Sequence, residues 1–352
     1  MILLRKFVTF IIAFVILFVI FNHIEHASKI EYHKLLNNNY YKNDTFEMVE
    51  KYKNKEIYNN IENGKHIAKN SKLAICCLAR NIEGNFNNMK KNIEYIGKHF
   101  SNYKVVIFEN DSEDNSRKLL FNWTKENSNI ILLDCLNYGD YNHQCKLKTK
   151  KGYDYGAVSY DRINRMAKYR EECLNYVKTN LNSYDYMLVV DFDLKGNQSI
   201  DGLFHSLAYK NWDAIFINGR IPLEGTFGTY TIIYDGMAYA DINNDFNYNI
   251  NNNSFKKLLL LLFNTQNQNY KMNKNICFVP VKSAFNGYGL YKIDSIKDSS
   301  YIGDNYCEHL NLNLDLYKQN KKLYINKLWK GYFNVQGPGS VIDFINSHFK
   351  NN

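Results

Sequence analysis

The chain of 352 residues has only three prolines, no CxxC pair among its seven cysteines, no internal repeat and no block of like charge. Without paired cysteines at metal-ligand spacing, the sequence gives no indication of a structural zinc site. The net charge of +9 is spread along the chain. It therefore indicates an anionic substrate at least as well as nucleic acid, and we expect no nucleic-acid partner.

One long apolar run stands near the N-terminus, from Phe7 to Phe21, with a threonine as its only polar member. Fifteen helical residues cover roughly 22 Å, less than the roughly 30 Å hydrocarbon core of a bilayer. Flanking apolar residues extend the run, and Arg5 and Lys6 can snorkel toward the headgroups. A cleaved signal peptide is the alternative, but no small-residue cleavage site follows closely. We predict a retained signal anchor over residues 7–24, preceded by a cytosolic tail of residues 1–6.

The basic residues on the N-terminal side of this run predict that the rest of the chain lies across the membrane from the cytosol. We therefore expect a single-pass type II membrane protein of the Golgi or ER membrane, with a lumenal catalytic domain, since a short anchor suits thin membranes. Residues 25–70 are polar and charged, and they predict a stem with some helix around Phe46–Ile61. In a lumenal domain one or two disulfides would be ordinary, with a pairing that the sequence leaves open.

From residue 71 onward, short apolar runs alternate with segments of helical pattern. We predict strands over residues 72–79, 104–110, 129–135, 185–193 and 213–219, and helices near residues 85–100, 116–127 and 162–181. This alternation is typical of an α/β domain with a mostly parallel, Rossmann-like central sheet flanked by helices. The predicted domain spans residues 71–345. An Asn-rich insertion or loop interrupts it over residues 241–275, where the apolar run Leu258–Phe263 is too short to span a membrane.

Two aspartates, Asp191 and Asp193, follow the apolar run Met187–Val190. On an extended backbone they share one face, and Phe192 between them points into the core. Like charges this close destabilise one another unless a cation or solvent intervenes. Two carboxylates at the end of a buried strand suit Mg²⁺ or Mn²⁺ that is shared with phosphates. The alternative is a solvated strand end with an N-capping aspartate.

Polar residues also follow the first two predicted strands. They are Arg80 and Asn81 after the first strand, and Glu109, Asn110, Asp111 and Asp114 after the second. Because ligands of parallel sheets gather at the carboxyl ends of the strands, we expect these side chains to lie near the aspartate pair. An Asp-x-Asp sequence alone is common, so the metal interpretation depends on this convergence.

Two arginines on the predicted helix over residues 162–181, Arg165 and Arg170, could face a diphosphate, because a guanidinium hydrogen-bonds phosphate oxygens well. Ordinary surface charges are the alternative. Further along, Val281–Lys292 reads "VKSAFNGYGLYK". Its glycines would allow the backbone to approach a ligand such as a sugar, although a tight turn between two strands explains them equally well.

Glu308 and His309 stand near the start of a predicted helix. Glu308 could act as general base on a hydroxyl group, and His309 could complete a metal site. A glutamate at a helix start also interacts favourably with the helix dipole, which is the structural alternative.

The order of these motifs resembles the GT-A class of nucleotide-sugar glycosyltransferases. The motifs are Ala79–Asn81, "ENDSEDNS", the arginine-containing helix, "LVVDFD", "SAFNGYGLYK" and "CEH". Within that class the layout is most similar to the capsule-associated α-1,3-mannosyltransferase-like family, over about Leu73–Trp329. One departure concerns Glu171, because relatives often have asparagine after the helix arginine, and this leaves the donor open.

The resemblance implies a role for each matching residue. Asp193 would bind Mn²⁺ or Mg²⁺, with Asp191 assisting through water or the ribose. The other implied donor-binding residues are Arg80, Asn81, Glu109 and Asp111 around the nucleotide, Arg165 near the diphosphate, and Ser283 to Gly289, including Gly287, around the sugar. Glu308 would face the acceptor, and His309 remains a further candidate metal ligand.

The expected activity is metal-dependent transfer of a hexose, with mannose as one candidate, from a GDP- or UDP-sugar to a hydroxyl of a glycan or glycoconjugate. An inverting reaction would need Glu308 as base, whereas a retaining one would need it only to orient the acceptor. A catalytically inactive, membrane-tethered glycan-binding protein of the same fold is the alternative. A two-carboxylate hydrolase is disfavoured, because neighbours on one strand cannot flank a scissile bond from opposite sides.

Overall fold

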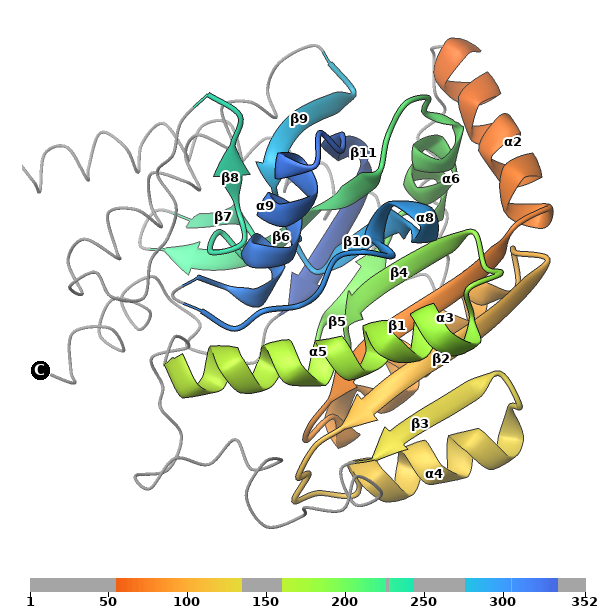
Figure 1. The fold of residues 1–352 in the computed structure, drawn as a ribbon, viewed down its shortest axis with the longest axis vertical. Coiled ribbons are helices and arrows are strands. Elements are labelled where there is room, and N and C mark those ends of the chain that lie inside the picture. The colour runs from red at the N-terminus through yellow and green to blue at the C-terminus, as the bar shows by residue number, and fades with distance from the viewer. Residues whose placement is uncertain (1–54, 135–159, 226–227, 244–275, 305, 335–352) are drawn as a thin grey trace, which may run out of the picture.

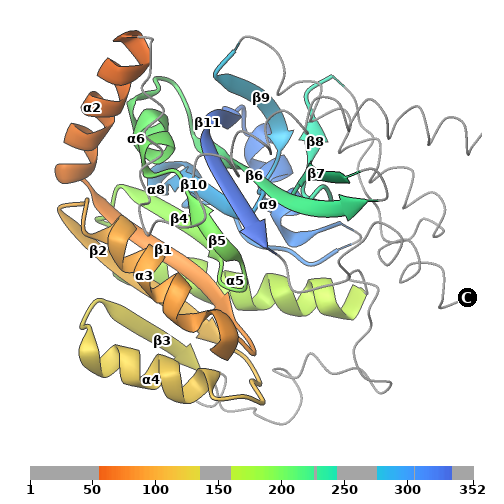
Figure 2. The same ribbon diagram turned by 180° about the vertical axis from the view of Figure 1, so that it is seen from behind.

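The structure is a computed structural model, and it describes residues 55–134, 160–225, 228–243, 276–304 and 306–334. These residues form one central sheet with helices on both faces (Figures 1 and 2). The described helices include none long and apolar enough to cross a membrane. The predicted tail, the predicted anchor over residues 7–24 and the first part of the predicted stem lie outside the described residues.

The described elements, in two groups, have the following bounds. The strands are β1 (Lys72–Ala79), β2 (Asn102–Glu109), β3 (Ile130–Asp134), β4 (Tyr186–Asp191), β5 (Lys195–Gln198), β6 (Ala214–Gly225), β7 (Gly228–Ile233), β8 (Ala240–Asp241), β9 (Phe278–Ser283), β10 (Tyr288–Lys292) and β11 (Leu323–Asn334). The helices are α2 (Lys55–Lys69), the short 3₁₀ helix η1 (Glu83–Asn85), α3 (Phe86–Gly97), α4 (Ser116–Glu126), α5 (Tyr160–Asn180), α6 (Ile200–Ala208), α8 (Ile293–Ile296) and α9 (Glu308–Lys318). The five strands and three helices predicted from the apolar pattern are confirmed.

The strand order across the sheet is β3-β2-β1-β4-β10-β6-β11-β9-β8, with β5 beside β11 and β7 beside β6. The first four strands are parallel, as predicted. The prediction of a mostly parallel sheet is nevertheless wrong, because β10 runs antiparallel to both β4 and β6. Strands β5, β7, β8 and β9 also pair in antiparallel fashion. In the second half of the sheet the two long strands, β6 and β11, are parallel to each other, and the shorter strands beside them pair in antiparallel fashion.

Helix α2 lies within the range that the sequence assigned to a stem, and it packs on α6 and the sheet. Ile61, Gly64 and Ala68 are buried at spacings of three and four residues, so they lie on one side of the helix. A Cβ atom on Gly64 would lie 1.8 Å from the carbonyl oxygen of Phe204 in α6. The close approach of the two helices therefore requires glycine at this position.

Two apolar clusters cover the two faces of the sheet. One includes side chains of α2, α3, α4 and α6, and the other includes side chains of α5, α8 and α9.

The described cysteines, which are Cys76, Cys77, Cys173, Cys277 and Cys307, are all free. Cys135 and Cys145, and most of the Asn-rich insertion, lie outside the described residues. Burial raises the pKa of the Cys76 and Cys77 thiols well above the usual value, so both stay uncharged.

Candidate functional site

The two aspartates occupy the carboxyl end of β4, beside the ends of β1 and β2. Strand β4 ends at Asp191, and Phe192 and Asp193 lie in the turn that follows. The ring of Phe192 is 1% exposed and packs against Phe86 and Trp123, with centroid distances of 6.5 and 6.3 Å. The prediction that this residue belongs to the core is confirmed. The side chain of Asp193 is exposed, whereas that of Asp191 is largely buried, so the two carboxylates have different environments.

Three asparagines from η1 and α3 hold the turn that contains Asp193 and the strand β5 that follows it. Asn85 is buried, and its side-chain amide donates to the carbonyl oxygens on either side of Asp193, at 3.1 and 2.7 Å. Asn88 and Asn92 both donate to the carbonyl oxygen of Gly196, at 3.2 and 3.0 Å. Their spacing of three and four residues puts them on one face of the helical segment. Sequence reasoning missed these residues, although their spacing in "GNFNNMKKN" is visible.

We expect Asn85→Ala to destabilise the protein by about 1–3 kcal/mol, because two buried carbonyl oxygens lose their donor. Asn88→Ala is the matched control, since this residue makes a single bond of 3.2 Å, and it should cost less than about 1 kcal/mol. Denaturant unfolding of the full-length chain measures both free energies. Equal costs for the two substitutions would contradict the positioning role of Asn85.

Both carboxylate oxygens of Asp191 accept hydrogen bonds. Arg170 Nη2 donates to Oδ1 at 2.8 Å, and the Tyr234 hydroxyl donates to Oδ2 at 3.0 Å. The backbone N–H of Asp191 donates to the carbonyl oxygen of Gly287 at 3.1 Å. Burial raises the pKa of Asp191 to about 6, the charge of Arg170 opposes this shift, and the charge of Asp193 adds to it. Asp191 is therefore fixed by the protein and has little freedom to adapt to a ligand.

The same arginine binds Glu308 at the start of α9. Arg170 Nε donates to Glu308 Oε1 at 3.0 Å, and the two side chains are 5% and 9% exposed. His309 is stacked on Phe285 with ring centroids 3.6 Å apart, and its Nε2 lies 3.8 Å from Glu308 Oε1. Burial and the charge of Arg170 lower the pKa of His309 well below its usual value, so the imidazole is neutral. Neither of its buried ring nitrogens has a hydrogen-bond partner in the described part of the chain.

The structure brings together the predicted nucleotide-pocket residues after β1 and β2. Arg80 Nε donates to Asp111 Oδ1 at 3.1 Å. The Oδ1 atom of Asn81 accepts a backbone N–H from the loop after β2, at 2.8 Å. Glu109 is fully buried and accepts from Arg117 Nε at 2.9 Å, so its carboxylate ties this loop to α4. Arg80, Asn81 and Asp111 are the members of this set that solvent reaches.

Arg165 lies half-buried on α5, near these residues. Burial raises the pKa of the neighbouring Tyr169, Asp111 raises it further, and Arg165 and Arg80 lower it, so these groups share one electrostatic environment. Desolvation by the surrounding protein raises the pKa of Asp193, although its side chain is exposed. The charge of Arg162, one turn before Arg165 on α5, partly offsets this shift. Helix α5 therefore places positive charge along the edge of the sheet where β1, β2 and β4 end.

The predicted sugar-framing residues have distinct positions. Ser283 is fully buried, and its hydroxyl donates to the carbonyl oxygen of Ala238 at 2.6 Å, so it serves the packing of this segment. Gly287 has a φ of +96°, which favours glycine, and it contacts the backbone of Asp191 through its carbonyl. The stretch connects β9 to β10, which are not paired with each other. Of the two, Gly287 adjoins the aspartate pair.

Asp235, which sequence reasoning missed, follows β7 and is half-buried with a φ of +57°. Burial raises the pKa of its carboxyl to about 8, the charges of Asp191 and Glu308 raise it as well, and Arg170 lowers it. A single acidic residue in "IIYDGM" gives no signal of this kind in the sequence. The site is thus an acidic cluster in which Arg170 is a central positive charge.

The raised pKa of Asp235 predicts a pH dependence of stability. Its contribution is present below the unfolded-state value, near 3.8, and is lost as pH rises through about 8. Asp235→Asn should therefore raise the melting temperature at pH 8.5 and leave it almost unchanged at about pH 4. Thermal unfolding of both full-length proteins in EDTA tests this expectation. A variant that melts below the wild type at pH 8.5 would contradict it.

The carboxylates of the site fit a metal ion whose coordination is shared between the protein and a substrate. No three His, Cys, Asp or Glu side chains within the described ranges are arranged to hold a metal ion alone. Mg²⁺ usually keeps several waters and binds through one or two carboxylates together with substrate phosphates. The exposed carboxylate of Asp193 fits this requirement, and Asp191, whose oxygens already accept hydrogen bonds, fits a supporting role. His309 as a third ligand stays a prediction.

Comparison with known proteins gives distant structural similarities only. No protein-family model matches the chain, and no curated protein matches it. The solved structures that resemble it include S. aureus TarS 1–349, at 13% identity and a TM-score of 0.41, covering 78% of this chain and 63% of that one. The structure of the same protein with UDP-GlcNAc has 12% identity and a TM-score of 0.42, and the match covers 76% of this chain and 59% of that one. The structure of a Pyrobaculum calidifontis mannosyltransferase with GDP-Man and Mn²⁺ has 9% identity and a TM-score of 0.42, and the match covers 79% of this chain and 65% of that one. The chain thus spans less than two thirds of each of these structures.

Proposed function

We propose that this chain is a metal-dependent glycosyltransferase that moves a hexose from a nucleoside diphosphate sugar to a hydroxyl of a glycan or glycoconjugate. The observation that carries the proposal is the edge of the sheet where β1, β2 and β4 end. It combines the exposed carboxylate of Asp193, the basic side chains of Arg80 and Arg165, and the largely buried carboxylates of Asp191 and Glu308. This combination suits a substrate with a diphosphate, a cation and a neutral sugar.

On the donor side, Asp193 would hold the metal while donor phosphates and water complete its coordination. A bound divalent cation stabilises the negative charge that develops on the departing nucleoside diphosphate. Arg165 would bind phosphate oxygens from α5. Asp111 holds Arg80 at the other side of the same edge, so its guanidinium would be preorganised toward the nucleotide.

On the acceptor side, Glu308 would contact the attacking hydroxyl. Arg170 donates a hydrogen bond to Oε1 of Glu308, and Oε2 of Glu308 lies 3.6 Å from the Cys307 thiol. A carboxylate held in this way can orient a hydroxyl, and in an inverting reaction it would also accept the proton. The arrangement serves either stereochemical outcome.

The proposal includes GDP- or UDP-sugar as donor, with mannose as one candidate hexose. It also includes a signal anchor over residues 7–24 and a lumenal catalytic domain in the Golgi or ER. The support for these parts is the order of the sequence motifs and the apolar run that follows Arg5 and Lys6.

A thermal-shift screen of the full-length chain against nucleoside diphosphates, with and without Mn²⁺, tests the proposal. At a ligand concentration of about 100 times the dissociation constant, binding stabilises the folded state by about 2.7 kcal/mol. We expect such a shift with GDP or UDP only when Mn²⁺ is present. A complete absence of shifts would refute the donor site. A shift without turnover of the matching nucleotide sugar would favour the inactive glycan-binding alternative.

A further inference from the structure

Arg170 connects three separate parts of the fold at one buried point. It lies on α5 and is 5% exposed, and its Nη2 binds Asp191 at the end of β4 at 2.8 Å. Its Nε binds Glu308 at the start of α9 at 3.0 Å. The guanidinium carbon lies 5.5 Å from the centroid of the Phe285 ring, in the segment between β9 and β10. One planar group therefore contacts both candidate reaction carboxylates.

The charge of Arg170 is secured by these partners. Burial lowers its pKa, but the charges of Asp191 and Glu308 outweigh that effect and hold the pKa well above its usual value. A guanidinium presents its donors in a fixed fork, so it can bind two carboxylates at a set angle. A lysine ammonium is a point charge on a flexible stem and cannot impose that angle.

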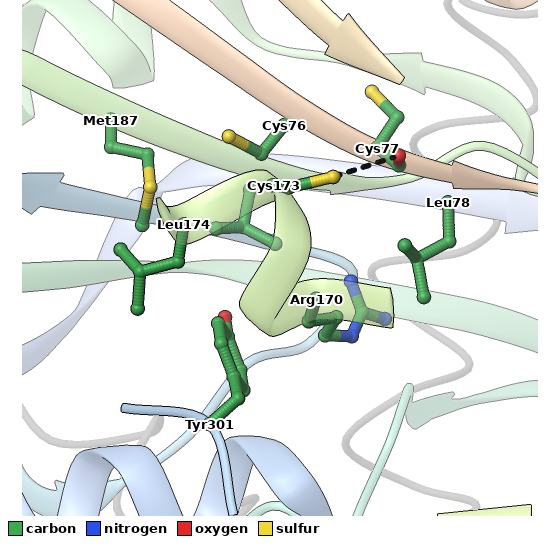
Figure 3. A pocket seen from close by; sticks show the side chains of 9 residues that line it. Cys76, Cys77, Leu78, Arg170, Cys173, Leu174, Met187 and Tyr301 are labelled. Atoms are coloured by element: carbon green, nitrogen blue, oxygen red, sulfur yellow. Dashed lines mark hydrogen bonds between the residues drawn. The ribbon is translucent and has the colours of Figure 1, made fainter. Parts of the chain in front are cut away.

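Among the described residues, no carboxylate lines the cavity that Arg170 borders. Arg170 also borders a small cavity, shown in Figure 3, with a volume of ≈ 10 Å³, which is about the room needed for one water molecule. Its other lining residues are Cys76, Cys77, Leu78, Cys173, Leu174, Met187, Val189 and Tyr301, none of which is a carboxylate. Burial raises the pKa of all three thiols, so they carry no charge that would draw the guanidinium away from Asp191 and Glu308.

We propose that Arg170 is a positioning residue that sets the mutual orientation of Asp191 and Glu308. The inference rests on the proposed function, in which Asp191 stands on the metal and donor side and Glu308 on the acceptor side. The same guanidinium then holds the carboxylate on the metal and donor side and the carboxylate on the acceptor side. It thereby fixes the approach of the acceptor hydroxyl to the sugar. Small misplacements of reacting groups are costly, since a shift of about 1 Å can reduce the rate by about 100-fold.

The first test compares full-length wild type, Arg170→Lys and Ile61→Ala, with Mn²⁺ and either GDP-mannose or UDP-glucose as probe. Arg170→Lys keeps the charge but loses the fork, so kcat should fall by about 10- to 100-fold. The KM for the donor should change by less than about threefold, because Asp193, Arg80 and Arg165 remain. Ile61→Ala is the destabilised control on the buried face of α2, and its kcat per folded molecule should equal that of the wild type. Wild-type kcat in Arg170→Lys would overturn the inference.

The second test needs no turnover, so it separates this inference from the proposed function. Asp191→Asn and Glu308→Gln are made singly and together, and each unfolding equilibrium constant is measured. Because one guanidinium joins the two carboxylates, the double substitution should deviate by more than about threefold from the product of the single effects. Additive effects would overturn the inference even in an active enzyme. Coupling without nucleotide binding or turnover would keep Arg170 as a link between these carboxylates and refute the glycosyltransferase proposal instead.

Discussion

Asp193→Ala should reduce sugar transfer by about 1,000-fold or more and leave the free energy of unfolding within about 0.5 kcal/mol of the wild type. The large effect on activity is expected because this exposed carboxylate is the most accessible oxygen ligand at the end of β4. The small effect on stability is expected because exposed side chains contribute little, and because the substitution removes repulsion with Asp191. Steady-state kinetics with Mn²⁺ and denaturant unfolding of the same preparation measure the two quantities.

Asp294→Ala is the matched control for this substitution. Asp294 is also an exposed aspartate, but it lies on α8, directly after β10. Because Lys292 at the end of β10 pairs with Tyr186 at the start of β4, α8 lies at the opposite end of β4 from Asp191. This variant should retain wild-type activity. Transfer that survives Asp193→Ala, or that is unaffected by EDTA, would exclude the metal role of Asp193.

Phe192→Ala should destabilise the protein by about 3–5 kcal/mol, because it empties a fully packed aromatic position in the core. Phe192 lies between the two aspartates in sequence but is 1% exposed and contacts the rings of Phe86 and Trp123. Phe192→Leu keeps most of the apolar volume and should cost less, about 1.5 kcal/mol. Denaturant unfolding of the full-length variants gives both values.

The Phe192→Leu variant also tests whether the two aspartates form the site while Phe192 between them belongs only to the core. It should bind Mn²⁺ and nucleoside diphosphate as the wild type does, since both carboxylates and the carbonyl bonds from Asn85 remain. Normal stability together with lost nucleotide binding would place Phe192 in the site and refute its role as a core residue.

The first half of the fold could be predicted because its strands and helices are long, apolar and regularly alternating. Strands β1, β2 and β4 each bury a continuous apolar run, and such runs are visible in the sequence. The second half could not be predicted in the same way. Strand β10 has five residues, begins with Tyr-Gly and follows a turn, so the glycines there are explained equally well by a backbone that approaches a ligand and by a tight turn between two strands. Its antiparallel pairing with β4 depends on the tertiary fold and leaves no local signal.

The site shows the same limit at the level of single residues. The Asp-x-Asp pair could be found because an apolar run stops abruptly at two charges. The contact of Arg170 with Glu308 joins residues 138 positions apart, and nothing local marks either as the partner of the other. The raised pKa of Asp235 comes from burial and from neighbouring charges, which only the folded chain assembles. The sequence therefore indicates which strand ends carry polar side chains, and only the folded chain shows how these side chains bind one another.

Binding of Mn²⁺ in the presence of nucleoside diphosphate tests the central claim most directly. Equilibrium dialysis of the full-length chain with saturating GDP or UDP should retain about one protein-bound Mn²⁺ per chain, and far less without nucleotide, because the phosphates supply part of the coordination. Asp193→Ala should lose this ion, and Asp294→Ala should keep it. Equal Mn²⁺ binding by Asp193→Ala and wild type, or no nucleotide-dependent binding by the wild type, would contradict a donor and metal site at the end of β4.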